Sequence, residues 1–289
     1  MRHLSTTFLL IQIMNGISFG AILFLLSSGL SLIFGVMKII NMAHGSYYML
    51  GGYVGLSVMR WTGNFLLAIL GGALSIAIIG LAMERFFLRR FHLQEMAQVL
   101  LTMGFALIIR DVVFLIWGGD PLSLSVPKFM QGSWHFGTIT FPAFRTVAIW
   151  IACAVALGLW VFNEKTSWGA KLRACIDDRE IAGGIGINVP WVSGSMFALG
   201  AALAGFGGVM GGPFFGIHPG TDFELIPLAF VVVIVGGMGS LRGVVVGSAF
   251  VGLTDTLGKS LIPDLSYFTL FVPMALVLAI KPTGLFGRG

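Results

Sequence analysis

The chain has 289 residues, of which 57% are apolar and only 10% are charged, and its formal net charge is +5. Soluble domains carry roughly 45–50% apolar and about 25% charged residues, so this chain lacks the ions to cover a globular surface. The composition excludes an ordinary cytosolic enzyme, a disordered protein and a nucleic-acid-binding domain. It predicts an all-α integral membrane protein, and the 41 glycines indicate helices that approach each other closely.

The predicted elements are membrane-spanning helices, each of which needs about 20 mostly apolar residues. Charges and Gly/Pro breaks divide residues 1–289, read as one transmembrane domain, into eight or nine such windows. The nine windows are 8–35, 40–59, 64–83, 97–117, 146–163, 190–212, 225–239, 243–262 and 265–281. The first is long enough for a kink, and the second is weakly apolar, which indicates a bent or re-entrant segment.

Basic residues in the short loops predict the orientation. Loop 84–96 has three arginines and loop 164–189 has two lysines and two arginines, so both are predicted to face the cytoplasm. Loop 118–145 has one lysine and one arginine, and loop 213–224 has neither but contains two acids. These two loops are therefore predicted to lie outside, with the N-terminus outside and the tail, including Arg288, inside.

Two motifs resemble enzyme sites and are rejected. Gly16, Ser18 and Gly20 match a hydrolase nucleophile elbow, but they lie within an apolar span, so helix packing is favoured. Residues 252–260 resemble a P-loop with five residues between the glycines, one more than the motif allows. The sequence thus predicts no catalytic residue, cofactor or metal site, and any ATP used must be hydrolysed by another chain.

Many glycines are spaced four residues apart, which places them on one face of a helix. They are Gly51/Gly55, Gly207/Gly211, Gly208/Gly212 and Gly239/Gly243/Gly247. Close helix packing explains most of them, and easy helix movement is the second interpretation.

Ionisable residues within spans are costly and therefore informative. Arg110, Asp111 and Asp255 are the candidates, and Asp255 is four residues from Lys259, a spacing that permits a local pair. Structural ion pairs near the span ends are favoured over a substrate role for all three.

The most polar segment at membrane depth covers residues 39–53. A helix would place Asn41 and His44 on one face, followed by Gly45, Ser46 and Tyr47. Polar groups at this depth must be buried in protein or line a cavity. A translocation pathway and an interhelical hydrogen-bond network both fit this pattern.

The longest cytoplasmic loop contains a charged stretch that predicts a short helix. It begins with acids, which suit a helix N-terminus, and ends in glycines, which suit a helix stop. Its candidate docking residues are Asp177, Asp178, Arg179, Glu180, Ala182, Gly186 and Asn188. A short helix between two spans, with nothing of its own to pack on, predicts a docking element for a soluble partner, and a solvated loop is the alternative.

Three blocks of the sequence carry a family resemblance. Residues 33–53 resemble the signature of branched-chain amino acid ABC transporter permeases of the LivH type. The segment 177–209 is similar to the coupling region and following helix of that family, and residues 235–248 look like its third characteristic block.

The resemblance implies a permease subunit of a bacterial importer in the cytoplasmic (inner) membrane. It implies as partners a second homologous permease, two cytoplasmic ATPase subunits and an extracytoplasmic substrate-binding protein, besides membrane lipid. By motif position, residues 177–188 carry the coupling contact, and residues 41–47 lie near the translocation pathway.

The substrate is left open by the same comparison. Importers of urea and short-chain amides share the Asn-Met-Ala-His-Gly core but commonly have an acidic residue after the Gly. This chain has Ser46 there, which favours amino acids, while aromatic acids remain an alternative. A rival of another class is an ATP-independent secondary transporter, for which only Asp111 and Asp255 are candidate ion-binding residues.

Overall fold

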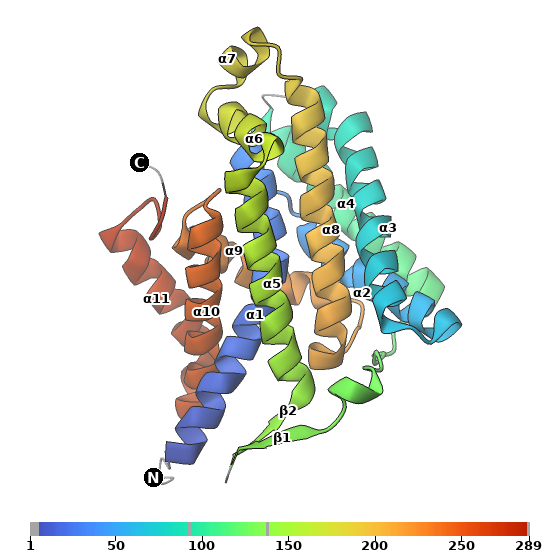
Figure 1. Ribbon diagram of the computed structural model, residues 1–289, viewed down its shortest axis with the longest axis vertical. Coiled ribbons are helices and arrows are strands. Elements are labelled where there is room, and N and C mark those ends of the chain that lie inside the picture. Colours follow the sequence, from blue (N-terminus) through green and yellow to red (C-terminus); the bar gives the residue numbers. More distant parts are fainter. Residues whose placement is uncertain (1–5, 92–93, 137–138, 288–289) are drawn as a thin grey trace.

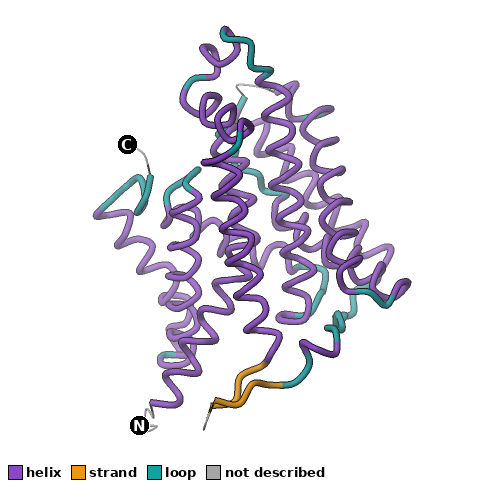
Figure 2. The backbone as a smooth tube through the Cα atoms, viewed as in Figure 1, coloured by secondary structure: helices purple, strands orange, loops and turns teal. Residues whose placement is uncertain are grey.

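The computed structural model describes residues 6–91, 94–136 and 139–287 as a bundle of long helices (Figure 1). The α-helices are α1 (Thr6–Met37), α2 (His44–Thr62), α3 (Phe65–Phe86), α4 (Glu95–Trp117), α5 (Ala143–Lys165), α6 (Ser167–Asp177), α7 (Arg179–Gly184), α8 (Val189–Phe215), α9 (Thr221–Gly236), α10 (Leu241–Leu261) and α11 (Ser266–Ile280). The short elements are the 3-10 helices η1 (Leu88–Phe91), η2 (Lys128–Met130) and η3 (Pro263–Leu265) and the strands β1 (Ser133–Phe136) and β2 (Ile139–Pro142). Helices account for most of the backbone (Figure 2).

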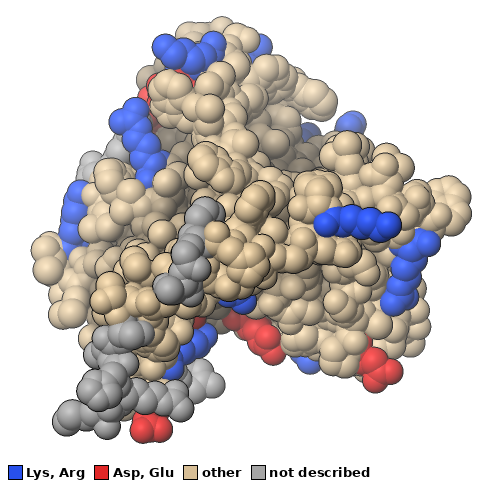
Figure 3. All heavy atoms as spheres, turned by 60° about the horizontal axis from the view of Figure 1, so that its bottom comes forward, with Lys and Arg blue, Asp and Glu red and all other residues tan. Residues whose placement is uncertain are grey.

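The structure confirms the helical membrane architecture. Each of the nine predicted windows overlaps one α-helix, and five helices, α1, α3, α4, α5 and α8, are long and apolar enough to cross a membrane. Broad stretches of the surface in Figure 3 carry no charged side chain, as lipid-facing helices require. The antiparallel β1–β2 hairpin within loop 118–145 was not predicted.

The two ends of the bundle differ in the elements they carry. Helices α6 and α7 lie at one end, and the hairpin and the start of α1 lie at the other (Figure 1). Arg89 of η1 donates a hydrogen bond to the carbonyl of Pro190, so the connection after α3 is at the α6–α7 end. The two loops predicted to be cytoplasmic therefore share one end, while Arg288 lies outside the described residues.

Helix α1 is the central element, packed against α8 on one side and α10 on another. Its glycines allow this, because a Cβ added at Gly20 would lie 2.6 Å from the carbonyl oxygen of Ser248 in α10. The hydroxyl of Ser18 donates to the carbonyl of Met14 in the same helix, at 2.8 Å. The Gly16–Gly20 pattern is therefore a packing face, as favoured above.

Two helices begin inside the bundle instead of at an end. After α1, residues 38–43 turn back, and His44 at the start of α2 contacts the carbonyl of Leu26 within α1. Lys38 lies in this turn with a φ of 56°, and it is the only non-glycine residue among the described residues that has a positive φ. After α8, residues 216–220 do the same for α9, with positive φ at Gly216 and Gly220.

The first turns of α2 and α9 lie against each other, and from there the two helices run to opposite ends of the bundle. Helix α3 then packs on α8, and α10 packs on α1, so α1–α2–α3 and α8–α9–α10 repeat one pattern in opposite directions. Interrupted helices in inverted repeats are typical of transporters, and their helix starts mark the substrate region.

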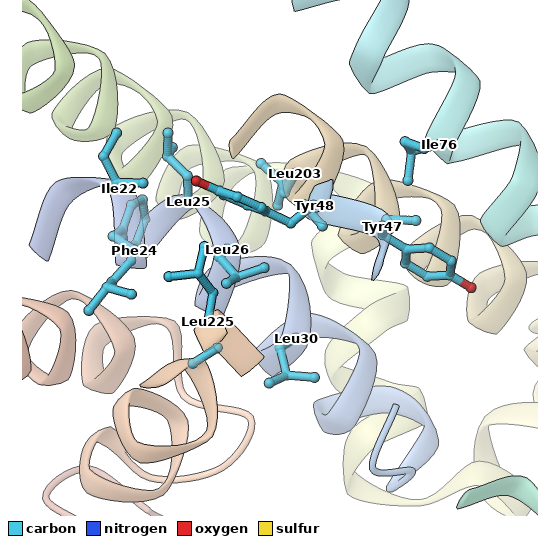
Figure 4. Packing of buried hydrophobic residues seen from close by; sticks show 14 of the residues in the cluster. Ile22, Phe24, Leu25, Leu26, Leu30, Tyr47, Tyr48, Ile76, Leu203 and Leu225 are labelled. Carbon is cyan, nitrogen blue, oxygen red and sulfur yellow. The ribbon is translucent and has the colours of Figure 1, made fainter. Parts of the chain in front are cut away.

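The glycines of α8 accommodate α2. Figure 4 shows Tyr47 and Tyr48 pointing in opposite directions from α2. A Cβ at Gly208 would collide with the carbonyl of Tyr48, and one at Gly211 would collide with its hydroxyl. Glycine spacing thus predicted a real packing face here. The prediction from glycine spacing is wrong for Gly239. This residue lies in the turn before α10 with a φ of 80°, so it does not share a helix face with Gly243.

We expect Gly208→Ala to prevent α2 and α8 from packing, because the clash is with backbone that cannot rotate away. Detergent-extracted protein should lose its monodisperse size-exclusion peak. Gly104→Ala in α4 is the matched control, since nothing lies within 4 Å of its added Cβ. Equal peaks for the two variants would contradict this packing.

Candidate functional site

The five predicted pathway residues meet at the start of α2, where all are buried. The sequence analysis expected Asn41 and His44 on one helix face. This is wrong, because α2 begins only at His44 and Asn41 lies before the helix. Instead, the Asn41 side-chain oxygen accepts from the backbone N–H of Ala43, at 3.1 Å. The adjacent N–H of Met42 donates to Thr102 of α4 at 3.2 Å, which anchors the non-helical segment.

His44 and Tyr47 belong to the packing of the bundle. The Nε2 atom of His44 is 2.9 Å from the Leu26 carbonyl oxygen. The Tyr47 ring packs edge-on against His44 and Phe197, and its hydroxyl is 2.7 Å from the Met83 sulfur. These contacts fit the hydrogen-bond network interpretation of the segment.

Gly45 and Ser46 join α2 to the first turn of α9. A Cβ at Gly45 would lie 2.5 Å from the Asp222 carbonyl oxygen, so only glycine allows this approach. The Ser46 hydroxyl lies 2.9 Å from Asp222 Oδ2 and 3.4 Å from the Ala106 carbonyl of α4. Three helices therefore converge on one serine and one aspartate.

Asp222 was missed by the sequence reasoning, which placed it in the outside loop 213–224. Helix α9 begins at Thr221 and not near 225, so Asp222 lies in its first turn with only 2% of its surface exposed. The available signal was an acid directly before an apolar run, a pattern that suits a helix N-terminus.

A small cavity lies beside the Ser46–Asp222 contact. It is lined by Met42, Ser46, Met103, Ala106, Asp222, Phe223 and Ile226. Its volume is about 10 Å³, the space of about one water molecule. The site is therefore closed in this conformation.

A larger cavity of about 440 Å³ lies further along α4 and is lined in part by Leu107, Arg110 and Asp111. The Arg110 guanidinium stacks over the ring of Phe223, with 5.4 Å to the ring centroid. No ion pair to Arg110 or Asp111 occurs among the described residues, so the predicted structural ion pairs are wrong for these two. The local pair is confirmed for Asp255, whose Oδ2 is 2.7 Å from Lys259 Nζ.

The predicted docking segment forms two helices rather than one. Asp177 ends α6, and Asp178 caps α7 by accepting the N–H groups of Glu180 at 2.8 Å and Ile181 at 2.9 Å. Gly186, with a φ of 89°, follows the helix, and the Asn188 side chain caps α8 by accepting from the N–H of Trp191.

Contrary to the expectation from the sequence, α7 does pack on the rest of the chain. Ala182 is 1% exposed, and Arg179 donates to the Ser193 hydroxyl of α8 at 3.2 Å. In the adjoining α6, burial raises the pKa of the Cys175 thiol, and the positive charge of Arg179 partly offsets this.

Helix α7 and its C-terminus expose two large apolar side chains. Ile181 is 64% exposed and Ile185 is 70% exposed, four residues apart. Glu180 is also exposed. Two exposed isoleucines at the tip of a bundle form an apolar surface that suits contact with another protein. The sequence reasoning selected the charged residues of this segment and missed these two.

Comparisons with known proteins match nearly the whole chain. The family model described as "Branched-chain amino acid transport system / permease component" matches residues 12–280. The high-affinity branched-chain amino acid transport system permease protein LivH of Salmonella typhimurium is 31% identical, with 96% of this chain and 95% of that protein aligned. BraD of Pseudomonas aeruginosa, of the same description, is 27% identical with the same shares aligned. LivM of Salmonella typhimurium is 24% identical over 90% of this chain and 67% of that protein.

Proposed function

The chain belongs to the family of branched-chain amino acid transport system permease components, and we propose that it moves branched-chain amino acids inward across the bacterial inner membrane. The match to LivH over 96% of the chain is the observation that carries the proposal. In this function the chain is the permease subunit of an ABC importer and not itself an enzyme. Urea, short-chain amides and aromatic acids are the alternative substrates.

The proposed mechanism is alternating access driven by separate ATPase subunits. Two such subunits dock at the α6–α7 end, where Ile181 and Ile185 are exposed. Closure of the ATPases pushes α7, which transmits the movement to α8 through the Arg179–Ser193 contact. Helix α8 then shifts against α2, and the cavity at Ser46 and Asp222 opens.

The proposed complex contains a second homologous permease and receives substrate from an extracytoplasmic binding protein. Similarity to both LivH and LivM, two permease proteins of one description, supports pairing of two related subunits. The binding protein sets much of the selectivity, so substrate assays require it.

Purification of the tagged chain from its native membrane in mild detergent tests this assembly. We expect a second permease and two nucleotide-binding subunits to co-purify. The complex in liposomes, supplied with its binding protein, should take up leucine, isoleucine and valine only with ATP. Uptake of urea or acetamide instead would select the alternative substrate. Transport by the chain alone without ATP would contradict the importer mechanism.

A further inference from the structure

Asp222 has a buried carboxylate, and one of its two oxygens accepts no hydrogen bond from the described residues. Its Oδ2 accepts from Ser46, while Oδ1 has no hydrogen-bond partner among the described residues. None of the ion pairs in the described part of the chain includes Asp222. An acid within a membrane bundle is costly, and its usual explanation is a functional partner of opposite charge.

The surroundings favour a negative charge at this position without supplying a fixed cation. Asp222 lies in the first turn of α9 and touches the first turn of α2 through Gly45 and Ser46. The N-terminal end of a helix carries a partial positive charge, so two helix starts stabilise the carboxylate. The free Oδ1 is then available to a mobile group that donates hydrogen bonds and carries positive charge.

The walls of the cavity define the rest of the ligand. Apart from Ser46 and Asp222, they consist of Met42, Met103, Ala106, Phe223 and Ile226, all hydrocarbon or thioether side chains. Methionine side chains are flexible and adapt to aliphatic groups of different shape. One carboxylate in an adaptable apolar pocket suits an ammonium group attached to a branched aliphatic chain.

We propose that Asp222, positioned by Ser46, binds the α-ammonium group of the transported amino acid while its aliphatic side chain lies against Met42, Met103 and Ile226. The inference rests on the proposed function and assigns residues within it. The cavity of about 10 Å³ must widen to admit an amino acid. Helix α4 supplies Met103, which is 42% exposed, and packs mainly on α2. Movement of α2 relative to α4, driven by α8, therefore opens the site toward the larger cavity at Arg110.

The decisive variant is Asp222→Asn, assayed in the full complex in proteoliposomes with saturating leucine-loaded binding protein. Asparagine has the same shape and still accepts from Ser46, so a purely structural Asp222 predicts an unchanged maximal rate. A substrate role predicts a loss of about tenfold or more, the effect of losing one charge-assisted hydrogen bond. Asp222→Glu should restore part of the rate. Asp255→Asn, which alters a buried acid elsewhere, is the matched control and should keep the wild-type rate.

A second variant decides the question if Asp222→Asn does not assemble. Met103→Lys places an ammonium group from half-exposed α4 beside Asp222, where it should occupy the site and reduce leucine uptake by about tenfold or more. Met103→Leu, which keeps an apolar wall, should transport normally. Wild-type uptake rates in Asp222→Asn or Met103→Lys overturn the assignment of Asp222 to the substrate ammonium group and leave the proposed function standing. A wild-type complex that moves another solute and no leucine overturns the proposed function.

Discussion

Replacement of both Ile181 and Ile185 by serine should abolish ATP-driven uptake while the permease stays folded in the membrane. The two side chains are 64% and 70% exposed in the free chain and are the apolar surface that α7 and its C-terminus offer to a partner. Burial of one isoleucine contributes about 1.5–3 kcal/mol, so loss of both weakens ATPase docking by roughly a hundredfold or more. The measurement is the amount of ATPase subunit that co-purifies, together with uptake in proteoliposomes.

Ile262→Ser is the matched control for this experiment. Ile262 is 49% exposed but follows α10, which packs against Gly16 near the start of α1, at the end of the bundle opposite α6 and α7. Its replacement should therefore leave ATPase docking unchanged. Full co-purification of the ATPases with the Ile181→Ser/Ile185→Ser variant would show that the docking surface lies elsewhere. Charge reversal at Asp178 and Arg179 is less specific, because these side chains hold α7 itself.

The helices could be predicted because their signal is local. Runs of apolar residues separated by charges and glycines define nine windows, and basic loops define the sides. The starts of α2 and α9 were misplaced because both helices begin inside the bundle. Whether Asp222 faces water or Ser46 depends on a residue 176 positions away, and no local pattern contains that information.

The predicted docking segment likewise has features that depend on tertiary packing and could not be predicted from local sequence. Its acids predicted a helix start, and Asp178 does cap α7. Which residues of a six-residue helix face solvent depends on how it packs, and the buried side is Ala182. The sequence analysis selected charged residues such as Asp178 and Arg179, which form hydrogen bonds within the chain. The exposed fractions in the structure instead select Ile181 and Ile185 as the contact residues.

Arg89→Leu should strongly destabilise the protein, because it leaves the carboxylate of Glu84 buried without a partner. Glu84, near the end of α3, is 2% exposed, and Arg89 contacts both of its oxygens, at 3.3 and 3.0 Å. Arg89 also donates to the Pro190 carbonyl at the start of α8, so it joins two helices beside α7. Removal of one partner of a buried pair costs about 3 kcal/mol, which lowers the melting temperature by roughly 6–12 °C.

The double variant Glu84→Gln/Arg89→Leu separates the charge from the packing. Glutamine fills the same space without a charge, so the double variant should melt several degrees above Arg89→Leu, since replacing both partners of a buried pair is far less costly than removing one. Arg90→Leu, at an exposed arginine next in the chain, should melt like the wild type. Equal melting temperatures for the single and double variants would mean that Arg89 acts only through Pro190. In that case the α3–α8 junction beside α7 would be held by the backbone contact with Pro190, and Glu84 would contribute no uncompensated charge.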